Sequence, residues 1–427
     1  MGNSNSDNKS KEDNLAKYGG IYLKPNKDRY HPGEQFEGII YLNLLTSYPG
    51  DSLYIQVKGL EKWVHAYTTR SNKRTHHHLG KEKETFLDVK IPVYKNLSGQ
   101  DFQPGQYAFP ISFLIPLNIP ASVYLEGTKF IASIEFKVKA ILDTFDPKAS
   151  KLKYKEQLLI EENRKTVNSQ LQQREEIALM ICCCCNYGFS TVSLQLEKDI
   201  LMPGETTNMR FSVDNSEGRL SFISVKCELI EKTVLGNNRF RFNRHPVAIS
   251  LPGFKAGGNL LEQVVQLTLP PYSQINAKNK KIHQKRITSY SDISNIIYPE
   301  NEIVPTTLGK IVNISYSLAV ELIYDGCCSC CFDNAIAHIP VQIFIPDFKF
   351  EPTVEAPMGW APQVMPTVNL SLGPLNESYG GGNQTYQGTE QQLRKMQIQD
   401  NFMKPQTSYD SSTFSVELQM TQRQITD

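Results

Sequence analysis

Strict alternation of apolar and polar residues is the dominant pattern of this chain. Between residues 134 and 142 the apolar side chains share one face, whereas Glu135, Lys137 and Lys139 share the other, as in a half-buried antiparallel strand. The same alternation recurs in four other segments, at 192–196, 209–213, 223–229 and 312–320. Turn residues separate these segments. The pattern therefore predicts an all-β protein built from packed antiparallel sheets.

A set of sequence landmarks occurs twice in the same order. Residues 28–34 (DRYHPGE) and 199–205 (DILMPGE) each follow a short strand-like segment and precede an alternating one. Farther along, segments 120–122 and 305–307 each begin with proline and lead into another long alternating run. Proline followed by glycine suits a tight turn, because proline fixes one central φ and glycine accepts a positive φ at the next. The repetition predicts two tandem copies of one Ig-like antiparallel β-sandwich.

The length of 427 residues is too great for one ordinary core and fits two domains with an unstructured remainder. We expect a disordered leader at 1–18, a first sandwich at 19–167, a linker at 168–185, a second sandwich at 186–350 and a disordered tail at 351–427. The tail prediction rests on composition, because that segment is rich in Gln, Gly, Ser and Pro and has no sustained period.

Charge and hydropathy argue against several classes of protein. A formal net charge of +1 gives no overall attraction to nucleic acid. The chain lacks the roughly 18 consecutive apolar residues of a membrane-spanning helix, and its polar start is unlike a secretory signal, so we expect a cytosolic protein. The sequence contains no phosphate-binding glycine loop, Gly-x-Ser-x-Gly or His-Glu-x-x-His motif, and we therefore predict that it is not an enzyme.

Eight of the nine cysteines stand in two clusters. The clusters consist of Cys182, Cys183, Cys184 and Cys185, and of Cys327, Cys328, Cys330 and Cys331. This spacing fits a reducing compartment better than a disulfide framework. The ninth, Cys227, alternates with apolar residues and is predicted to lie in the core.

The clusters fit three interpretations. In an Ig-like sandwich the domain entry and the last inter-strand loop lie at the same end, so C-x₂-C pairs from both clusters could form a four-cysteine zinc site. Cysteines beside the apolar run 177–181 are equally suited to S-acylation, which would anchor the chain to a membrane. The third interpretation is that they are small hydrophobic residues at a domain junction.

The N-terminus fits the pattern for N-myristoylation. Gly2 becomes the first residue when methionine is removed, and Ser6 stands at the favoured position. The alternative is a polar leader without modification. A single myristoyl chain binds membranes only marginally, so a second membrane-binding signal is expected.

Two polar segments between strands, 70–83 and 272–302, are read as inserted basic loops. Their candidate ligands for anionic lipid or phosphate are Lys73, Arg74, Lys278, Lys280, Lys281, Lys285 and Arg286. The simpler interpretation is a pair of solvated loops. The consecutive residues His76, His77 and His78 are predicted to belong to the solvated loop, because neighbours in a flexible loop do not converge on one metal ion.

The landmarks together resemble the arrestin superfamily, in particular its arrestin-domain-containing (α-arrestin) branch. In the first copy the matching motifs are Pro-Gly-Glu at 32–34, Gly to Trp at 59–63 (one residue shorter than in the family), Pro-Gly-x-Tyr-x-Phe-Pro at 104–110 with Ile111 where the family has phenylalanine, and Pro-x-Ser at 120–122. In the second copy they are Pro-Gly-Glu at 203–205, Asp-Asn-Ser at 214–216 and Ile-Pro-Val at 339–341.

The resemblance implies an adaptor in trafficking, endocytosis or signalling. Such a protein binds the cytoplasmic tails of membrane proteins and the trafficking machinery at the plasma membrane or endosomes, and strand addition to a sheet edge is one way to do so. The tail here lacks the Pro-Pro-x-Tyr motif with which the family recruits ubiquitin ligases. A retromer-subunit-like scaffold and a metal or redox sensor built on the cysteines are the alternatives.

Overall fold

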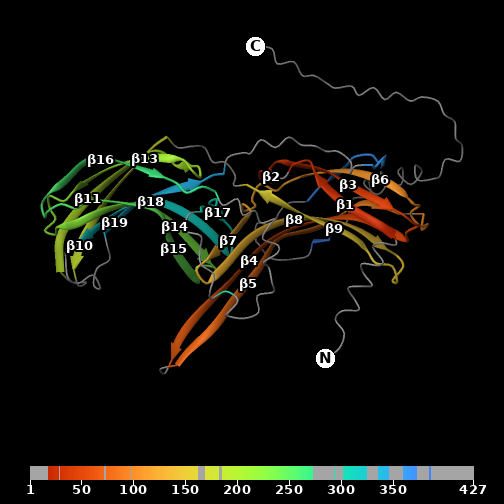
Figure 1. Cartoon of the computed structure of the whole chain (residues 1–427), viewed down its shortest axis with the longest axis horizontal. Helices are drawn as coiled ribbons and strands as arrows, with labels where there is room; N and C mark the ends of the chain where they lie inside the picture. Colours follow the sequence, from red (N-terminus) through yellow and green to blue (C-terminus); the bar gives the residue numbers. More distant parts are fainter. Residues whose placement is uncertain are drawn as a thin grey trace, which may run out of the picture.

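The computed structural model describes residues 18–27, 29–71, 74–96, 98–161, 169–181, 185–272, 293, 302–324, 335–345, 359–372 and 384–385. Most of these residues belong to strands, which confirms the all-β prediction. The strands form two sandwiches that lie end to end along the long axis of the molecule (Figure 1). No helix in the described ranges is long and apolar enough to cross a membrane.

The first sandwich packs two sheets. The first sheet contains β1 (Gly19–Pro25), β3 (Gln35–Leu44), β6 (Gly105–Leu114), β20 (Gln363–Val364) and β21 (Val368–Leu370). Their order is β1-β3-β6-β20, and β21 also pairs with β6. The second sheet contains β2 (Arg29–Tyr30), β4 (Gly50–Ser71), β5 (Arg74–Lys95), β7 (Val123–Gly127), β8 (Phe130–Thr144), β9 (Leu152–Ile160) and β22 (Gln384–Thr385). Their order is β2-β9-β8-β4-β5-β22, and β7 pairs with β8.

The second sandwich repeats this plan. One sheet contains β10 (Ser169–Ile181), β11 (Cys185–Lys198), β13 (Thr206–Asp214) and β16 (Asn259–Thr268), in the order β10-β11-β13-β16. The other contains β12 (Ile200–Leu201), β14 (Phe222–Leu235), β15 (Phe240–Pro252), β17 (Thr307–Leu308), β18 (Val312–Tyr324) and β19 (Ala335–Ile343). Their order is β12-β19-β18-β14-β15, and β17 pairs with β18.

The duplicated Pro-Gly-Glu turns have the same geometry in both sandwiches. Gly33 and Gly204 adopt φ of 81° and 77°, a left-handed conformation that glycine accepts without strain. In each turn the glutamate accepts a hydrogen bond at 2.9 Å from the backbone N–H three residues earlier, Glu34 from His31 and Glu205 from Met202. Each turn follows a two-residue strand that pairs in parallel with a late strand of its own domain. The repeat found in the amino-acid sequence is therefore also a repeat of the structure.

Two segments differ from the expected boundaries. Residues 169–181, expected in the linker, form β10 and pair antiparallel with β11, because Leu171, Ile177 and Leu179 pack in or against the second core. Residues 359–372, expected in the disordered tail, return to the first sandwich, where β20 and β21 pair in parallel with β6. Met365, Leu370 and Leu372 of this segment are at most 8% exposed. Burial of these three side chains explains why this part of the expected tail holds an ordered position.

Cys227 is fully buried in the second core, as its place in the alternating pattern predicted. Burial raises the pKa of its thiol to about 12. Because the thiolate is the reactive form, we expect Cys227 in native protein at neutral pH to resist iodoacetamide and to react fully after denaturation. Mass spectrometry of its peptide, with and without guanidinium chloride, measures this difference. Alkylation of the native protein as fast as that of the denatured chain would contradict the prediction.

Candidate functional site

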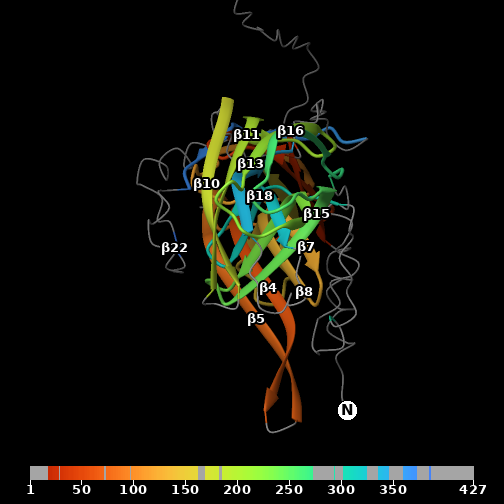
Figure 2. The same ribbon diagram turned by 90° about the vertical axis from the view of Figure 1, so that its left-hand side faces the viewer.

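A long two-stranded ribbon, the outer part of β4 and β5, projects beyond both sandwiches (Figures 1 and 2). We call its described residues, 64–71 and 74–83, the arm. The segment 70–83 was expected to be an inserted loop. Its described residues are instead strands, since cross-strand pairs continue from Val64 with Lys81 to Ser71 with Arg74. The polar composition concealed the strands because both faces of an isolated ribbon meet solvent.

The arm has two different faces. Neighbouring residues of a strand point to opposite sides, so Tyr67 and Thr69 share one face with His78 and His76, their direct cross-strand partners. We call this the ring face. His77 lies on the opposite face. The three histidines therefore belong to a strand rather than to a loop, and only two of them share a side.

Ring contacts join the base of the arm to β15 of the second sandwich. The Tyr67 ring stacks on His65 and His78, with centroids 5.7 and 5.1 Å apart. His65 in turn lies 4.8 Å from Phe240 and 5.0 Å from Phe242. Burial is the main cause that lowers the pKa of His65, so its imidazole stays neutral at pH 7. These contacts fix the direction of the arm relative to the second sandwich.

The two sandwiches share a buried aromatic contact. Trp63 of β4 is 2% exposed and meets Phe240 edge to face, with centroids 5.4 Å apart. Phe130 of β8 stacks on Phe242 at 4.3 Å. Gly236, with φ of 62°, lies so close that an added Cβ would stand 2.9 Å from the Trp63 ring. Trp63 and Phe130 consequently belong to the same apolar core as the second sandwich.

Glu61 connects the domains through backbone hydrogen bonds. Its carboxylate is fully buried and accepts N–H groups of the β17–β18 turn, from Lys310 at 2.9 Å, Ile311 at 2.8 Å and Val312 at 3.1 Å. Desolvation raises the pKa of Glu61, and the three N–H donors act in the opposite direction. Gly309 makes this approach feasible, since an added Cβ would lie 2.5 Å from the carboxylate.

A second buried carboxylate, Glu161, follows β9 in the first sandwich. It lies 3.2 Å from the Arg29 guanidinium and 3.5 Å from the His31 imidazole. Tyr272 is paired with Ile303 of the second domain, and burial is the main cause that raises its pKa, while Arg29 lowers it and Glu161 raises it to a smaller extent. Neither carboxylate was predicted from the sequence. Glu61 could have been recognised, because it stands at a position where the alternation of β4 places a buried side chain.

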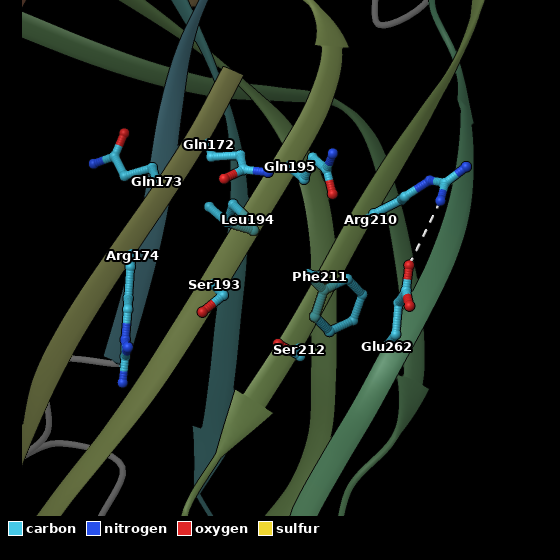
Figure 3. Close-up of a pocket in the computed structure, with 10 residues that line it drawn as sticks. All are labelled: Gln172, Gln173, Arg174, Ser193, Leu194, Gln195, Arg210, Phe211, Ser212 and Glu262. Carbon is cyan, nitrogen blue, oxygen red and sulfur yellow. Dashed lines mark ion pairs between the residues drawn. The ribbon is translucent and has the colours of Figure 1, made fainter. Parts of the chain in front are cut away.

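A polar hollow of about 480 Å³ lies on the outer face of the sheet β10-β11-β13-β16 (Figure 3). It is lined by Gln172, Gln173, Arg174, Ser193, Leu194, Gln195, Arg210, Phe211, Ser212 and Glu262. Arg210 and Glu262 form an ion pair at 3.5 Å across one side of the hollow. A sheet face covered by amides and hydroxyls is the ordinary solvent-facing side of a sandwich, and we assign it no ligand.

Most residues singled out from the sequence lie outside the described part. These are Gly2, Lys73, Cys182, Cys183, Cys184, Lys278, Lys280, Lys281, Lys285, Arg286, Cys327, Cys328, Cys330 and Cys331. Cys185 begins β11, although only its backbone is described. Arg74 begins β5 near the arm's exposed tip. Within the described ranges, no group of three or more His, Cys, Asp or Glu could hold a metal ion.

In the first sandwich, the two sides of the β1-β3-β6 sheet differ in whether a further segment pairs with them. At β6 the sheet is extended by β20 and β21, segments of the same chain. At the opposite edge, β1 pairs with β3 alone among the described strands. Tyr22 at the middle of β1 is 37% exposed and meets Tyr154 of β9 edge to face at 4.7 Å. This edge can receive a further strand.

The fold and the shared interface define a tandem β-sandwich protein. The family models described as "Arrestin (or S-antigen), N-terminal domain" and "Arrestin (or S-antigen), C-terminal domain" match residues 19–164 and 187–348. The chain belongs to the arrestin family, which confirms the resemblance seen in its motifs. Membership in this family supports a general adaptor or scaffold role.

One curated relative is the "Arrestin domain-containing protein A" of Dictyostelium discoideum. It is 26% identical over 208 residues, which are 46% of this chain and 34% of the relative. The chain thus spans about a third of the length of the curated relative that it matches.

Proposed function

We propose that the chain is a membrane-associated cytosolic adaptor whose first sandwich binds an extended segment from the cytoplasmic tail of a membrane protein. The observation that carries this proposal is the occupancy of the two sheet edges. The β6 edge already holds residues 363–370 of the same chain in two short parallel strands. The sheet is therefore built to accept an extended segment by backbone pairing, and β1 offers the equivalent opposite edge.

Backbone pairing suits an adaptor with many partners. Main-chain hydrogen bonds supply affinity that does not depend on the partner's sequence, whereas alternate side chains of the added strand give specificity. Along β1, Ile21 and Leu23 point into the core and Tyr22 points outward. The added strand would lie beside the Tyr22 and Tyr154 rings, which provide an apolar surface for one of its side chains.

Membrane attachment is part of the proposal and rests on sequence. Gly2 would carry a myristoyl group, and the cysteine clusters would carry either S-acyl groups or zinc. A lipid anchor would confine the adaptor to the surface that displays its partners, which raises their effective concentration.

Photo-crosslinking tests the proposed edge. With benzoylphenylalanine in place of Tyr22, irradiation in cells should attach the chain to cytosolic segments of integral membrane proteins. The matched control places the same residue at Phe189, which has similar exposure, 39%, on the second sandwich. Mass spectrometry identifies the attached segments. Identical partners at both positions, or attachment at Tyr22 to soluble proteins alone, would overturn the β1 assignment.

A further inference from the structure

The arm carries its positive charge mainly on one face. Arg70, Lys81 and Lys83 point to the side that also carries His77, away from the ring face. We call this the basic face. All three cations are exposed, and none of them forms an ion pair with the described part of the chain. The arm's carboxylate, Glu82, lies on the ring face and accepts a hydrogen bond from the Trp63 indole at 3.2 Å.

The ring face explains why the basic face stays exposed. Tyr67 and its neighbours pack against Phe240 of the second sandwich, with the Tyr67 and Phe240 centroids 5.3 Å apart. At the arm's base, Lys310 reaches across the domain boundary to Glu84 at 2.7 Å. The arm is thus held from one side, and its cations remain on the other. Figures 1 and 2 show that the ribbon extends well past both sandwiches.

We propose that the basic face of the arm binds an anionic lipid membrane surface. Its three cations are displayed along a protruding ribbon rather than around a cleft. A row of charges on a convex element is complementary to a flat, multiply charged surface such as a leaflet with acidic lipids. A phosphorylated peptide would instead be held by cations that converge around its phosphate group.

This inference extends the proposed membrane-associated adaptor, because one acyl chain alone binds membranes marginally and reversibly. The arm would supply the second signal that Gly2 acylation requires. Each basic residue near an acidic leaflet strengthens binding of the protein to the membrane about five-fold, so three together strengthen it about 100-fold. The interaction is electrostatic and weakens as salt is added.

Vesicle sedimentation tests the proposal with full-length, unacylated protein. The variant Arg70→Gln, Lys81→Gln, Lys83→Gln should bind phosphatidylcholine vesicles containing phosphatidylserine about 100-fold more weakly than the native chain. The control Lys148→Gln, Arg219→Gln, Lys255→Gln removes the same charge from exposed positions outside the arm and should retain binding. Circular dichroism and thermal unfolding verify that both variants are folded.

Three outcomes would overturn the lipid assignment: equal vesicle binding by the native and arm-variant chains, equal loss in the control, or binding of a phosphorylated peptide through the arm without binding to acidic vesicles. Crosslinking at Tyr22 reports separately on the adaptor edge. If vesicle binding fails while Tyr22 still attaches to membrane proteins, the arm inference is wrong and the proposed function stands. If vesicle binding holds while Tyr22 attaches to none, the proposed function fails instead.

Discussion

The substitution Glu61→Leu is expected to lower the free energy of unfolding by about 3 kcal/mol. Leucine fills a similar volume but accepts no hydrogen bond, so the buried N–H groups of Lys310, Ile311 and Val312 would lose their partner. Each orphaned donor costs about 1–3 kcal/mol, whereas removal of a buried carboxylate recovers part of that cost. Because the two partners lie in different sandwiches, the loss should also loosen the contact between them.

Denaturant unfolding and hydrogen exchange measure these effects. Glu61→Gln should be intermediate, since its amide oxygen still accepts while its NH₂ group opposes the donors. Glu84→Gln provides the control, because it removes the exposed ion pair with Lys310 and leaves the buried bonds intact; an exposed pair contributes about 0–1 kcal/mol. A Glu61→Leu protein as stable as the Glu84→Gln protein would show that the carboxylate does not hold the domains together.

The features that sequence analysis predicted are local ones. Alternation marks the strands because each buried face must be apolar, and the segment from Val312 to Val320 is buried at every second residue. The Pro-Gly-Glu turns are encoded within seven residues, so Gly33 and Gly204 could be identified without knowledge of the fold. Cys227 was placed in the core by the same periodicity.

The features that it missed depend on contacts between distant residues. Glu61 binds N–H groups roughly 250 positions away, and backbone donors carry no side-chain signature in a sequence. Met365 and Leu370 lie in a segment too short to show a sustained alternation, and their burial depends on pairing with β6, which lies far away in the sequence. The strands of the arm could not be recognised in the sequence for a different reason. Its strands have neither face in a core along most of their length, so the apolar alternation that identifies other strands is absent there.

The substitution Met365→Asp is expected to release the tail segment from β6. Met365 is 4% exposed within the first core, and its N–H donates to the Ala108 carbonyl at 2.8 Å. An aspartate at this site would have to bury an unpaired charge, a cost greater than the short strands β20 and β21 can offset. We expect the free energy of unfolding to fall by about 3 kcal/mol, in the range for loss of a buried methionine.

Hydrogen exchange along β6 distinguishes release of the segment from general damage. The β6 amides on the side of β20 and β21 should exchange at least about tenfold faster in the Met365→Asp protein, while those on the side of β3 and those of β18 in the second sandwich keep their protection. Val364→Asp is the matched control, because the neighbouring side chain is 68% exposed and tolerates the same charge. If Val364→Asp and Met365→Asp gave the same exchange along β6, the paired position of residues 363–370 would not describe the protein in solution. A difference confined to Met365→Asp would establish that this edge is closed by the chain itself, which leaves β1 as the edge open to a partner.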